Sequence, residues 1–363
     1  MEVAKIDIVK FINIYKAYPV LDVRSPGEFK QAHIPSAYSL PLFTDEERKI
    51  IGTAYKKESR AIAVKIGVKY FGLKMHNIIE DAEKIVEEYN EKHHVKSNSI
   101  IVHCWRGGMR SNAVAWLLSL YGLKVYVLVG GYKAFRNWAL QQFNKNYNIN
   151  ILGGYTGSGK TIVLEELGKQ GKSIVNLESL ASHKGSAFGN IGMPPQPSQE
   201  MFENLLATAL HEQSNSESYL HGGIWIEDES QRIGDVNIPA TFWEQMRMSN
   251  IYFLDIPFEE RLNFLLEDYS KASLEQLMNA VIRIKKRLGG LETKNTINYL
   301  LEGKLSDAFR VLLKYYDKWY YKGLHKRENI KGILHKISFT YAEPATIAYT
   351  IQEYISKKVI MND

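Results

Sequence analysis

Residues 149–161, Ile-Asn-Ile-Leu-Gly-Gly-Tyr-Thr-Gly-Ser-Gly-Lys-Thr, constrain the fold of this chain more than any other stretch. An apolar run leads into the pattern G-x-x-x-x-G-K-[ST], and an amphipathic run follows from Ile162 to Leu167. This order predicts a strand, a glycine loop and a helix, which is the setting of a phosphate-binding loop (P-loop). A glycine-rich turn without a ligand is the alternative, but both flanks favour the phosphate-binding interpretation.

Six residues of this loop are the predicted phosphate or diphosphate ligands. Glycines let backbone N–H groups turn toward an anion, and the N-terminus of the following helix adds positive potential. Lys160 would bring a charge to the outer phosphates, and the Thr161 hydroxyl could ligate Mg²⁺. We predict no metal site built from protein ligands alone and no tightly bound cofactor. The predicted ligands are Gly154, Gly157, Ser158, Gly159, Lys160 and Thr161.

The length and the order of apolar segments indicate two domains. The chain has 363 residues, 45% of them hydrophobic, whereas single domains usually hold about 100–200 residues. Residues 1–140 alternate short apolar strands with helical stretches, including charged helices over 45–70 and 77–93. Residues 145–363 begin with the P-loop and end in a helix-rich region. We therefore predict two α/β domains, each with a parallel sheet, and a helical C-terminal part in the second.

Composition indicates the cellular compartment and the kind of partner to expect. The single cysteine excludes an internal disulfide, which suits a reducing cytosol, and the net charge of +6 suits a polyanionic partner. The most apolar stretch, residues 113–131, is interrupted by Gly122 and Lys124, so it predicts a helix, a turn and a strand rather than a membrane span. We therefore expect a cytoplasmic protein without a membrane partner.

Cys104 is the second chemical centre of the sequence. It lies between a predicted strand, Ser99 to His103, and a helix that we expect to begin near Asn112. Loop amides at a helix N-terminus favour a thiolate, and nearby arginines would add positive charge. A lone cysteine is more often a small buried hydrophobic residue, but two arginines and two glycines favour a solvent-accessible nucleophile here. The predicted catalytic residues are Cys104, Arg106 and Arg110.

Residues 15–137 resemble the rhodanese family of sulfurtransferases. The resemblance rests on Leu21-Asp-Val-Arg24, Glu28-Phe29, His33-Ile-Pro-Ser-Ala37, the Cys104 loop and Gly130-Gly-Tyr132. It implies a rhodanese-like fold over the first domain. Many single-domain rhodaneses place four residues between the cysteine and the arginine, whereas five separate Cys104 from Arg110. This wider ring is similar to that of dual-specificity phosphatases, so a group larger than a bare sulfur would fit.

A long segment rich in glycine, serine and proline follows the second strand predicted in the P-loop domain. It runs from Leu180 to Gly189 and continues into Pro194-Pro-Gln-Pro197. Loops of this length are often functional, although an ordinary surface loop is the alternative. The candidate substrate-binding residues are His183, Lys184, Gly185 and Ser186.

An apolar strand over residues 223–230 ends in three acids. Carboxylates at a strand end beside a P-loop can hold Mg²⁺ through water or orient a substrate. We choose Glu227 and Asp228 as the candidates among them.

Two later helices, over residues 258–269 and 274–288, carry several basic side chains. They would clamp bound phosphates or a nucleic-acid backbone, or they are solvated helix faces. The candidate anion clamp consists of Arg261, Arg283, Lys286 and Arg287.

Taken together, the two halves resemble the tRNA 2-selenouridine synthase family over nearly the whole chain. Besides the two loops, the resemblance rests on His183-Lys-Gly-Ser-Ala-Phe-Gly189, Gln196-Pro-Ser-Gln199, Phe202-Glu-Asn204, Glu227-Asp-Glu-Ser230 and Lys286-Arg-Leu-Gly-Gly290. It implies two steps at the wobble uridine in the anticodon arm of tRNA. First, 2-thiouridine is S-geranylated from geranyl diphosphate. Then selenium from selenophosphate replaces the S-geranyl group, with Cys104 serving this selenium step.

The resemblance also implies substrates and partners. Geranyl diphosphate would occupy the P-loop, tRNA would be the acceptor, and an enzyme that supplies selenophosphate is a candidate partner. Because ATP suits the same loop, one alternative is an ATP-dependent sulfurtransferase that activates a base or a small molecule by phosphorylation. A second alternative is a non-enzymatic sensor, in which Cys104 reports oxidation and the P-loop domain switches a partner.

Overall fold

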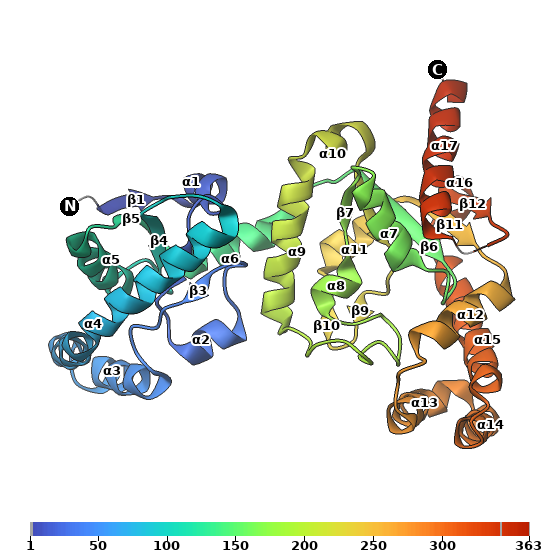
Figure 1. The fold of residues 1–363 in the computed structure, drawn as a ribbon, viewed down its shortest axis with the longest axis horizontal. Coiled ribbons are helices and arrows are strands. Elements are labelled where there is room, and N and C mark those ends of the chain that lie inside the picture. The colour runs from blue at the N-terminus through green and yellow to red at the C-terminus, as the bar shows by residue number, and fades with distance from the viewer. Residues whose placement is uncertain (1–2, 342, 363) are drawn as a thin grey trace. The chain divides into compact units, whose positions relative to one another are not determined.

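The structure, a computed structural model, describes residues 3–341 and 343–362 (Figure 1). Contacts divide the chain into two compact units, Met1–Gln141 and Gln142–Asp363. The predicted domain ranges, 1–140 and 145–363, include residues 1, 2, 342 and 363, which lie outside the described residues. Each unit is described by itself below.

The first unit is built on a five-stranded sheet in which every neighbouring pair of strands is parallel. Its strands, in spatial order, are β1 (Val3–Ile6), β5 (Lys124–Leu128), β4 (Ser99–His103), β2 (Val20–Asp22) and β3 (Tyr38–Ser39). Every residue of the central strand β4 is buried, as expected for a parallel strand covered on both faces. The helices are α1 (Ile8–Ile14), α2 (Pro26–Gln31), α3 (Asp45–Lys57), α4 (Arg60–His93), α5 (Met109–Tyr121) and α6 (Gly131–Gln142).

Local sequence explains where the helices of the first unit begin. Ser25 and Glu28 form a capping box at the start of α2, with a proline in the first turn. The predicted helices over 45–70 and 77–93 are wrong in their bounds, because the helical conformation is interrupted at Ser59. The Ser59 hydroxyl accepts a hydrogen bond from Ile62 N at 3.2 Å and begins a helix of 34 residues. This helix continues through Gly67 and Gly72, since each glycine costs a helix only about 1 kcal/mol.

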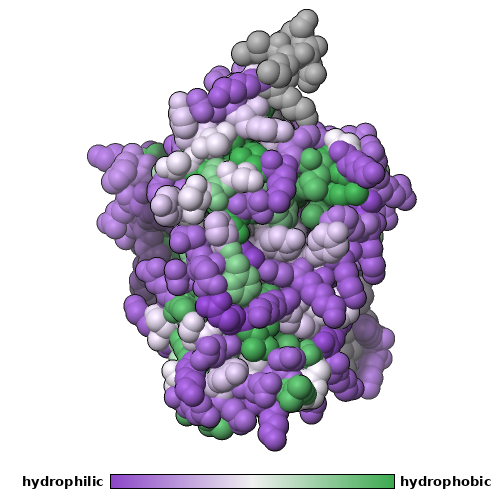
Figure 2. Space-filling view, turned by 90° about the vertical axis from the view of Figure 1, so that its right-hand side faces the viewer, coloured by the Kyte–Doolittle hydropathy of each residue, from purple (hydrophilic) through white to green (hydrophobic). Residues whose placement is uncertain are grey.

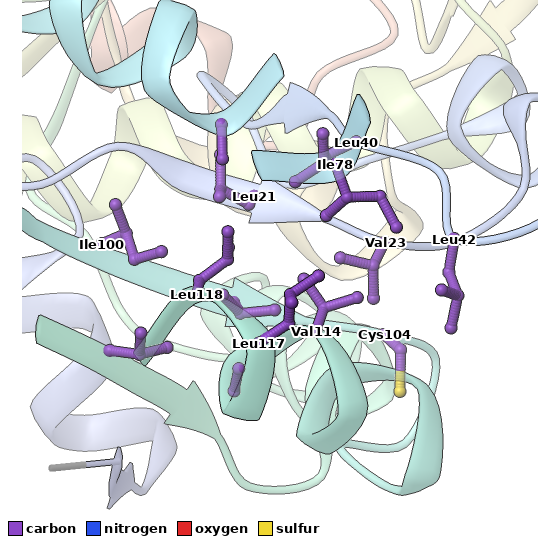
Figure 3. Close-up of a cluster of buried hydrophobic side chains, with 14 of the residues drawn as sticks. Leu21, Val23, Leu40, Leu42, Ile78, Ile100, Cys104, Val114, Leu117 and Leu118 are labelled. Carbon is purple, nitrogen blue, oxygen red and sulfur yellow. The ribbon is translucent and has the colours of Figure 1, made fainter. Parts of the chain in front are cut away.

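One core cluster of the first unit is formed by buried side chains of this sheet and of helices α4 and α5. Leu21 and Val23 from β2 and its end, Ile100 from β4, and Leu118 from α5 belong to one buried cluster (Figure 3). Cys104 belongs to the same cluster and lies at its edge in Figure 3. The core therefore fixes the strand end from which Cys104 projects.

The second unit has its own parallel five-stranded sheet. Its strands, in spatial order, are β12 (Leu334–Ser338), β11 (Asn250–Asp255), β6 (Ile149–Gly154), β8 (Ile224–Glu227) and β7 (Ser173–Val175). A short antiparallel pair is formed by β9 (Arg232–Ile233) and β10 (Val236–Asn237). The helices are α7 (Lys160–Lys169), α8 (Leu177–Ala181), α9 (Gln199–Ser214), α10 (Glu217–Gly222), α11 (Ala240–Met248), α12 (Phe258–Asp268), α13 (Leu274–Leu288), α14 (Gly290–Leu301), α15 (Leu305–Leu324), α16 (Ile330–Ile333) and α17 (Pro344–Asn362).

The helical C-terminal part of this unit is confirmed. Helices α12 to α15 share a buried cluster that includes Leu262, Leu277, Leu300 and Leu312. The last helix, α17, instead returns to the sheet and packs on α7. The predicted α/β class, with a parallel-sheet P-loop domain after the first α/β domain, is therefore confirmed.

The surface in Figure 2 is mostly hydrophilic, with hydrophobic side chains gathered in small groups between polar ones. Among residues 3–341 and 343–362, no helix combines the length and the apolar character needed to cross a membrane.

Candidate functional site

The first candidate site is the loop that follows β4. Strands β2, β4 and β5 are parallel neighbours, so their carboxyl ends meet at one edge of the sheet. Cys104 follows β4 there, Asp22 ends β2, and Gly130 and Gly131 follow β5. The sequence motifs that are far apart in the first domain thus meet around Cys104.

The turn after β5 holds the backbone of the Cys104 loop. Tyr132 N donates to Cys104 O at 2.8 Å, and Lys133 N donates to Trp105 O at 3.0 Å. Gly131 has a φ of +55°, and a Cβ there would lie 2.2 Å from Cys104 O. Only glycine permits this close approach, which gives a physical reason for the Gly-Gly-Tyr motif.

Arg24 connects the end of β2, the segment after α2 and Tyr132, all close to the Cys104 loop. Its guanidinium is buried, donates to Asp22 Oδ2 at 2.6 Å and to Ala32 O at 2.7 Å, and lies 3.9 Å from the centre of the Tyr132 ring. A buried charge of this kind requires a carboxylate and full hydrogen bonding. Asp22 and Arg24 therefore support the loop from below.

The Cys104 sulfur receives hydrogen bonds that favour its ionised form. Gly108 N donates to Sγ at 3.4 Å, and Ser111 Oγ lies 3.4 Å from Sγ. Burial by itself would raise the pKa of the thiol, but the Ser111 hydroxyl and the amides of Gly108, Ser111 and Arg106 outweigh it and hold the pKa below its usual value. Sequence reasoning missed Ser111, although a hydroxyl in the first turn of the helix after the cysteine was a signal for it.

The expectation of a solvent-accessible thiol is wrong for this conformation. Cys104 is only 3% exposed, because its side chain belongs to the core cluster while Trp105, Arg106 and Met109 face solvent. The surroundings of the sulfur thus favour the thiolate, and the sulfur is covered in this conformation.

The predicted roles of the two arginines also change. Arg110 Nη1 donates to Glu28 Oε2 at 2.9 Å, and this pairing, together with Arg48, outweighs burial and lowers the pKa of Glu28 to about 2. Arg106 is exposed and acts on the sulfur through its backbone amide. Neither guanidinium accounts for the lowered thiol pKa, because amides and a hydroxyl already do so. The helix after the loop begins at Met109, three residues before the predicted Asn112, as these amides require.

Ser111→Ala should raise the thiol pKa, because the variant loses the hydroxyl that stabilises the thiolate. The thiolate absorbance curve should move to higher pH, and since the chain has one cysteine the signal reports Cys104 alone. Ser119→Ala is the matched control, because Ser119 is a buried serine further along the same helix. An unchanged titration in Ser111→Ala would contradict the assigned role.

The second candidate site is the P-loop after β6, the central strand of the second sheet. Gly157 and Gly159 have φ of +80° and +70°, and Ser158 N donates to Tyr155 O at 3.1 Å. Within the described part of the chain, the amides of Gly157, Gly159 and Lys160 donate to no other protein group. These three amides therefore point to no protein acceptor among the described residues, and the binding of an anion there stays a prediction.

The Lys160 side chain extends over the P-loop toward its first glycine. Its Nζ donates to Gly154 O at 3.0 Å and lies 5.8 Å from the centre of the Tyr320 ring. The Tyr320 hydroxyl accepts from Gly154 N at 3.1 Å and donates to Asp228 Oδ2 at 2.6 Å, while Asp228 Oδ1 accepts from Arg327. Both oxygens of Asp228 are thus engaged, so the structure gives Asp228 the role of holding Tyr320 behind the loop.

The carboxylates nearest Thr161 differ in part from those predicted. Thr161 Oγ1 donates to Glu178 Oε2 at 2.6 Å, and Glu178 N donates to Glu227 Oε1 at 2.9 Å. Burial, and then the Glu178 charge, raise the pKa of Glu227 to about 8, which favours its protonated form at neutral pH. The same two causes raise the pKa of Glu229. Sequence reasoning missed Glu178, and it did not choose Glu229 among the three acids of its strand end. A glutamate three residues after the second strand was the signal for Glu178.

The segment 183–186 forms a compact turn against these acids. Gly185 has a φ of +67°, and a Cβ there would lie 2.4 Å from Glu229 Oε2. His183 is buried and accepts from Gly185 N at 3.2 Å, and Phe188 N donates to the Ser186 hydroxyl at 3.1 Å. Lys184 Nζ is paired with Asp268 at 2.7 Å. The turn lies beside the P-loop acids, but Lys184 is already neutralised by a carboxylate.

The four residues of the predicted anion clamp do not act as one group. Arg261 is 4% exposed, forms two hydrogen bonds of 2.8 Å with Asp317, and donates to Thr156 O at 3.0 Å. It is therefore a support of the P-loop rather than a free cation. Arg283 donates to Ala187 O at 3.3 Å. Lys286 and Arg287 are exposed in the last turn of α13.

Asp317→Ala should destabilise the second unit by about 3 kcal/mol, because it leaves the Arg261 charge buried without a carboxylate. It should also weaken diphosphate binding, since Arg261 holds the Thr156 carbonyl of the loop. Urea unfolding and diphosphate titration measure the two effects. Asp307→Ala, at an exposed position of the same helix, is the control; equal behaviour of both variants would refute the support role.

Comparison with known protein families finds a match for each of the two domains. The rhodanese-like domain model matches residues 10–137, and the model described as "tRNA 2-selenouridine synthase AAA domain" matches residues 147–336. The fold and the two loops therefore define a rhodanese domain joined to a P-loop domain.

Two relatives that align with most of this chain have the same name. "tRNA 2-selenouridine synthase" of Sulfurovum sp. is 34% identical over 83% of this chain and 87% of its own length, and that of Hydrogenovibrio crunogenus is 33% identical over 87% and 91%. The crystal structure of the N-terminal domain of a putative ATP/GTP binding protein from Clostridium difficile 630 is 36% identical, covers 38% of this chain and 99% of its own, and has a TM-score of 0.34. The chain belongs to the tRNA 2-selenouridine synthase family.

Proposed function

We propose that this chain is a transferase that converts 2-thiouridine at the wobble position of tRNA to 2-selenouridine in two steps. The observation that carries the proposal is the pairing, in one chain, of an open P-loop with a loop that stabilises a thiolate. The names of the relatives support tRNA as the acceptor. The net charge of +6 suits this polyanion.

In the first step, the P-loop binds the diphosphate of geranyl diphosphate. The sulfur of 2-thiouridine attacks the first carbon of the geranyl chain, the carbon–oxygen bond breaks, and diphosphate leaves as the base loses its N3 proton. Lys160 and the free loop amides stabilise the charge that develops on the leaving diphosphate. The Thr161 hydroxyl, 2.6 Å from Glu178, is the candidate contact for Mg²⁺ when the cation accompanies the diphosphate.

In the second step, selenium replaces the S-geranyl group at C2 of the base. S-geranyl-2-thiouridine, selenophosphate and water give 2-selenouridine, geranylthiol and phosphate, without oxidation or reduction. Alkylation prepares this exchange, because an alkylated sulfur leaves as a thiol. We assign Cys104 to this step, since its loop stabilises a thiolate and its amides suit an oxyanion such as selenophosphate.

An ATP-dependent sulfurtransferase is the rival function, because the same P-loop suits the phosphates of ATP. Labelled geranyl diphosphate and labelled ATP, each supplied with 2-thiouridine tRNA and pure protein, separate the two. The proposal predicts that the geranyl label enters tRNA in the absence of ATP. ATP hydrolysis coupled to product, with no geranyl label in tRNA, would establish the rival.

A further inference from the structure

A large pocket in the first unit lies beside the Cys104 loop and has no part in the chemistry described so far. It has a volume of about 660 Å³ and lies between α3, α4 and the start of α5. This volume falls within the range of about 300–1,000 Å³ that is usual for small-molecule sites. Its walls are mainly apolar and include Leu42, Phe43, Ile51, Val64, Val68 and Phe71.

The pocket is continuous with the Cys104 loop. Met109 and Arg110 line it, and Gly108, the residue before them, donates its amide to the Cys104 sulfur. Leu42 lines the pocket and belongs to the same buried cluster as Cys104 (Figure 3). A ligand in this pocket would therefore place an attached group next to the loop that covers the sulfur.

Charge at the pocket indicates what carries the ligand. Lys49 and Lys56 also line it and are exposed, as is Arg48, which is paired with Glu28 at 2.9 Å. Exposed cations around an apolar cavity fit an apolar chain carried by a polyanion. A free lipid would not need the cations, and an unmodified nucleic acid would not need the apolar walls.

We propose that this pocket binds the prenyl chain of the S-geranylated tRNA and thereby presents C2 of the modified base to the Cys104 loop. This inference rests on the proposed function, because it assigns a holding site to the intermediate of that reaction. It separates the two roles of the geranyl group: its diphosphate is recognised by the P-loop in the first step, and its hydrocarbon is recognised in the first domain in the second.

Filling the pocket tests the proposal. Gly52 lines the pocket on α3, and a Cβ there would meet nothing within 4 Å, so Gly52→Trp can place an indole in the cavity. Gly72→Trp is the matched control, because Gly72 is also an exposed helical glycine with open space but does not line the pocket. Val68→Asp is a second pocket variant, at a side chain that is 62% exposed.

The first readout is the affinity of the full-length protein for an anticodon stem-loop RNA with S-geranyl-2-thiouridine, compared with 2-thiouridine. The geranyl group should tighten binding by about tenfold or more, as expected for burial of an apolar chain. Gly52→Trp and Val68→Asp should lose this gain, whereas Gly72→Trp should keep it. If both pocket variants keep the gain, the proposal is overturned.

The second readout is selenation of the presynthesised S-geranyl RNA. Gly52→Trp and Val68→Asp should slow this step by about tenfold or more while leaving geranylation unchanged. Loss of a self-associated form in Gly52→Trp, with normal binding of the geranylated RNA, would assign the pocket to a second copy and overturn the proposal. If the unmodified protein carries out neither step, the proposed function is refuted. The binding comparison uses presynthesised RNA, so its result does not depend on turnover.

Discussion

Lys160→Ala should abolish geranylation of 2-thiouridine tRNA, with a loss of about a hundredfold or more. In the structure, Lys160 Nζ donates to the Gly154 carbonyl of its own loop, a contact that a bound diphosphate can replace. Without it, charge on the departing diphosphate loses its nearest cation. Mass spectrometry of nucleosides from treated tRNA measures the product directly.

Two comparisons make the Lys160 result specific. Lys169→Ala, an exposed lysine at the end of the same helix, should retain full geranylation. Selenation of presynthesised S-geranyl tRNA should survive in Lys160→Ala, because the proposed function assigns the P-loop to the first step alone. Geranylation at the normal rate in Lys160→Ala would remove the P-loop from the reaction.

Cys104→Ser should halt selenation by about a thousandfold while geranylation continues, so that S-geranyl tRNA accumulates. A serine hydroxyl in this loop stays protonated at neutral pH, whereas hydrogen bonds from Ser111 and nearby amides favour the cysteine thiolate. Nucleoside mass spectrometry with both donors present gives the ratio of S-geranyl to seleno product.

Ala115→Ser is the control for Cys104→Ser, because it adds a hydroxyl to the same buried cluster without touching the sulfur. It separates a loss of chemistry from a loss of packing. Simultaneous failure of both steps in Cys104→Ser, with both steps intact in Ala115→Ser, would refute the division of labour between the two loops.

Short-range patterns in the sequence predicted the parts of the fold that depend on neighbouring residues. The P-loop and the strand Ser99–His103 could be predicted because glycine spacing and apolar runs act locally. The break at Ser59 was missed, because a serine cap competes with a continuous helical pattern and only packing decides between them.

The errors at the candidate sites have one physical origin. Arg110, Arg261 and Lys184 were assigned to catalysis, an anion clamp and substrate binding. Each is paired with a carboxylate that lies 82, 56 or 84 residues away in the chain, respectively. A positive charge in the sequence does not show which partner neutralises it. The burial of Cys104 was missed for a related reason, because its position at the edge of the core depends on Leu42 and on α5.

The order of events in the unmodified protein tests the central claim most directly. Pure protein, 2-thiouridine tRNA, geranyl diphosphate and selenophosphate are mixed without ATP, and tRNA nucleosides are measured over time. S-geranyl-2-thiouridine should rise first and then fall as 2-selenouridine replaces it. Formation of 2-selenouridine without geranyl diphosphate, or only after addition of ATP, would contradict the account.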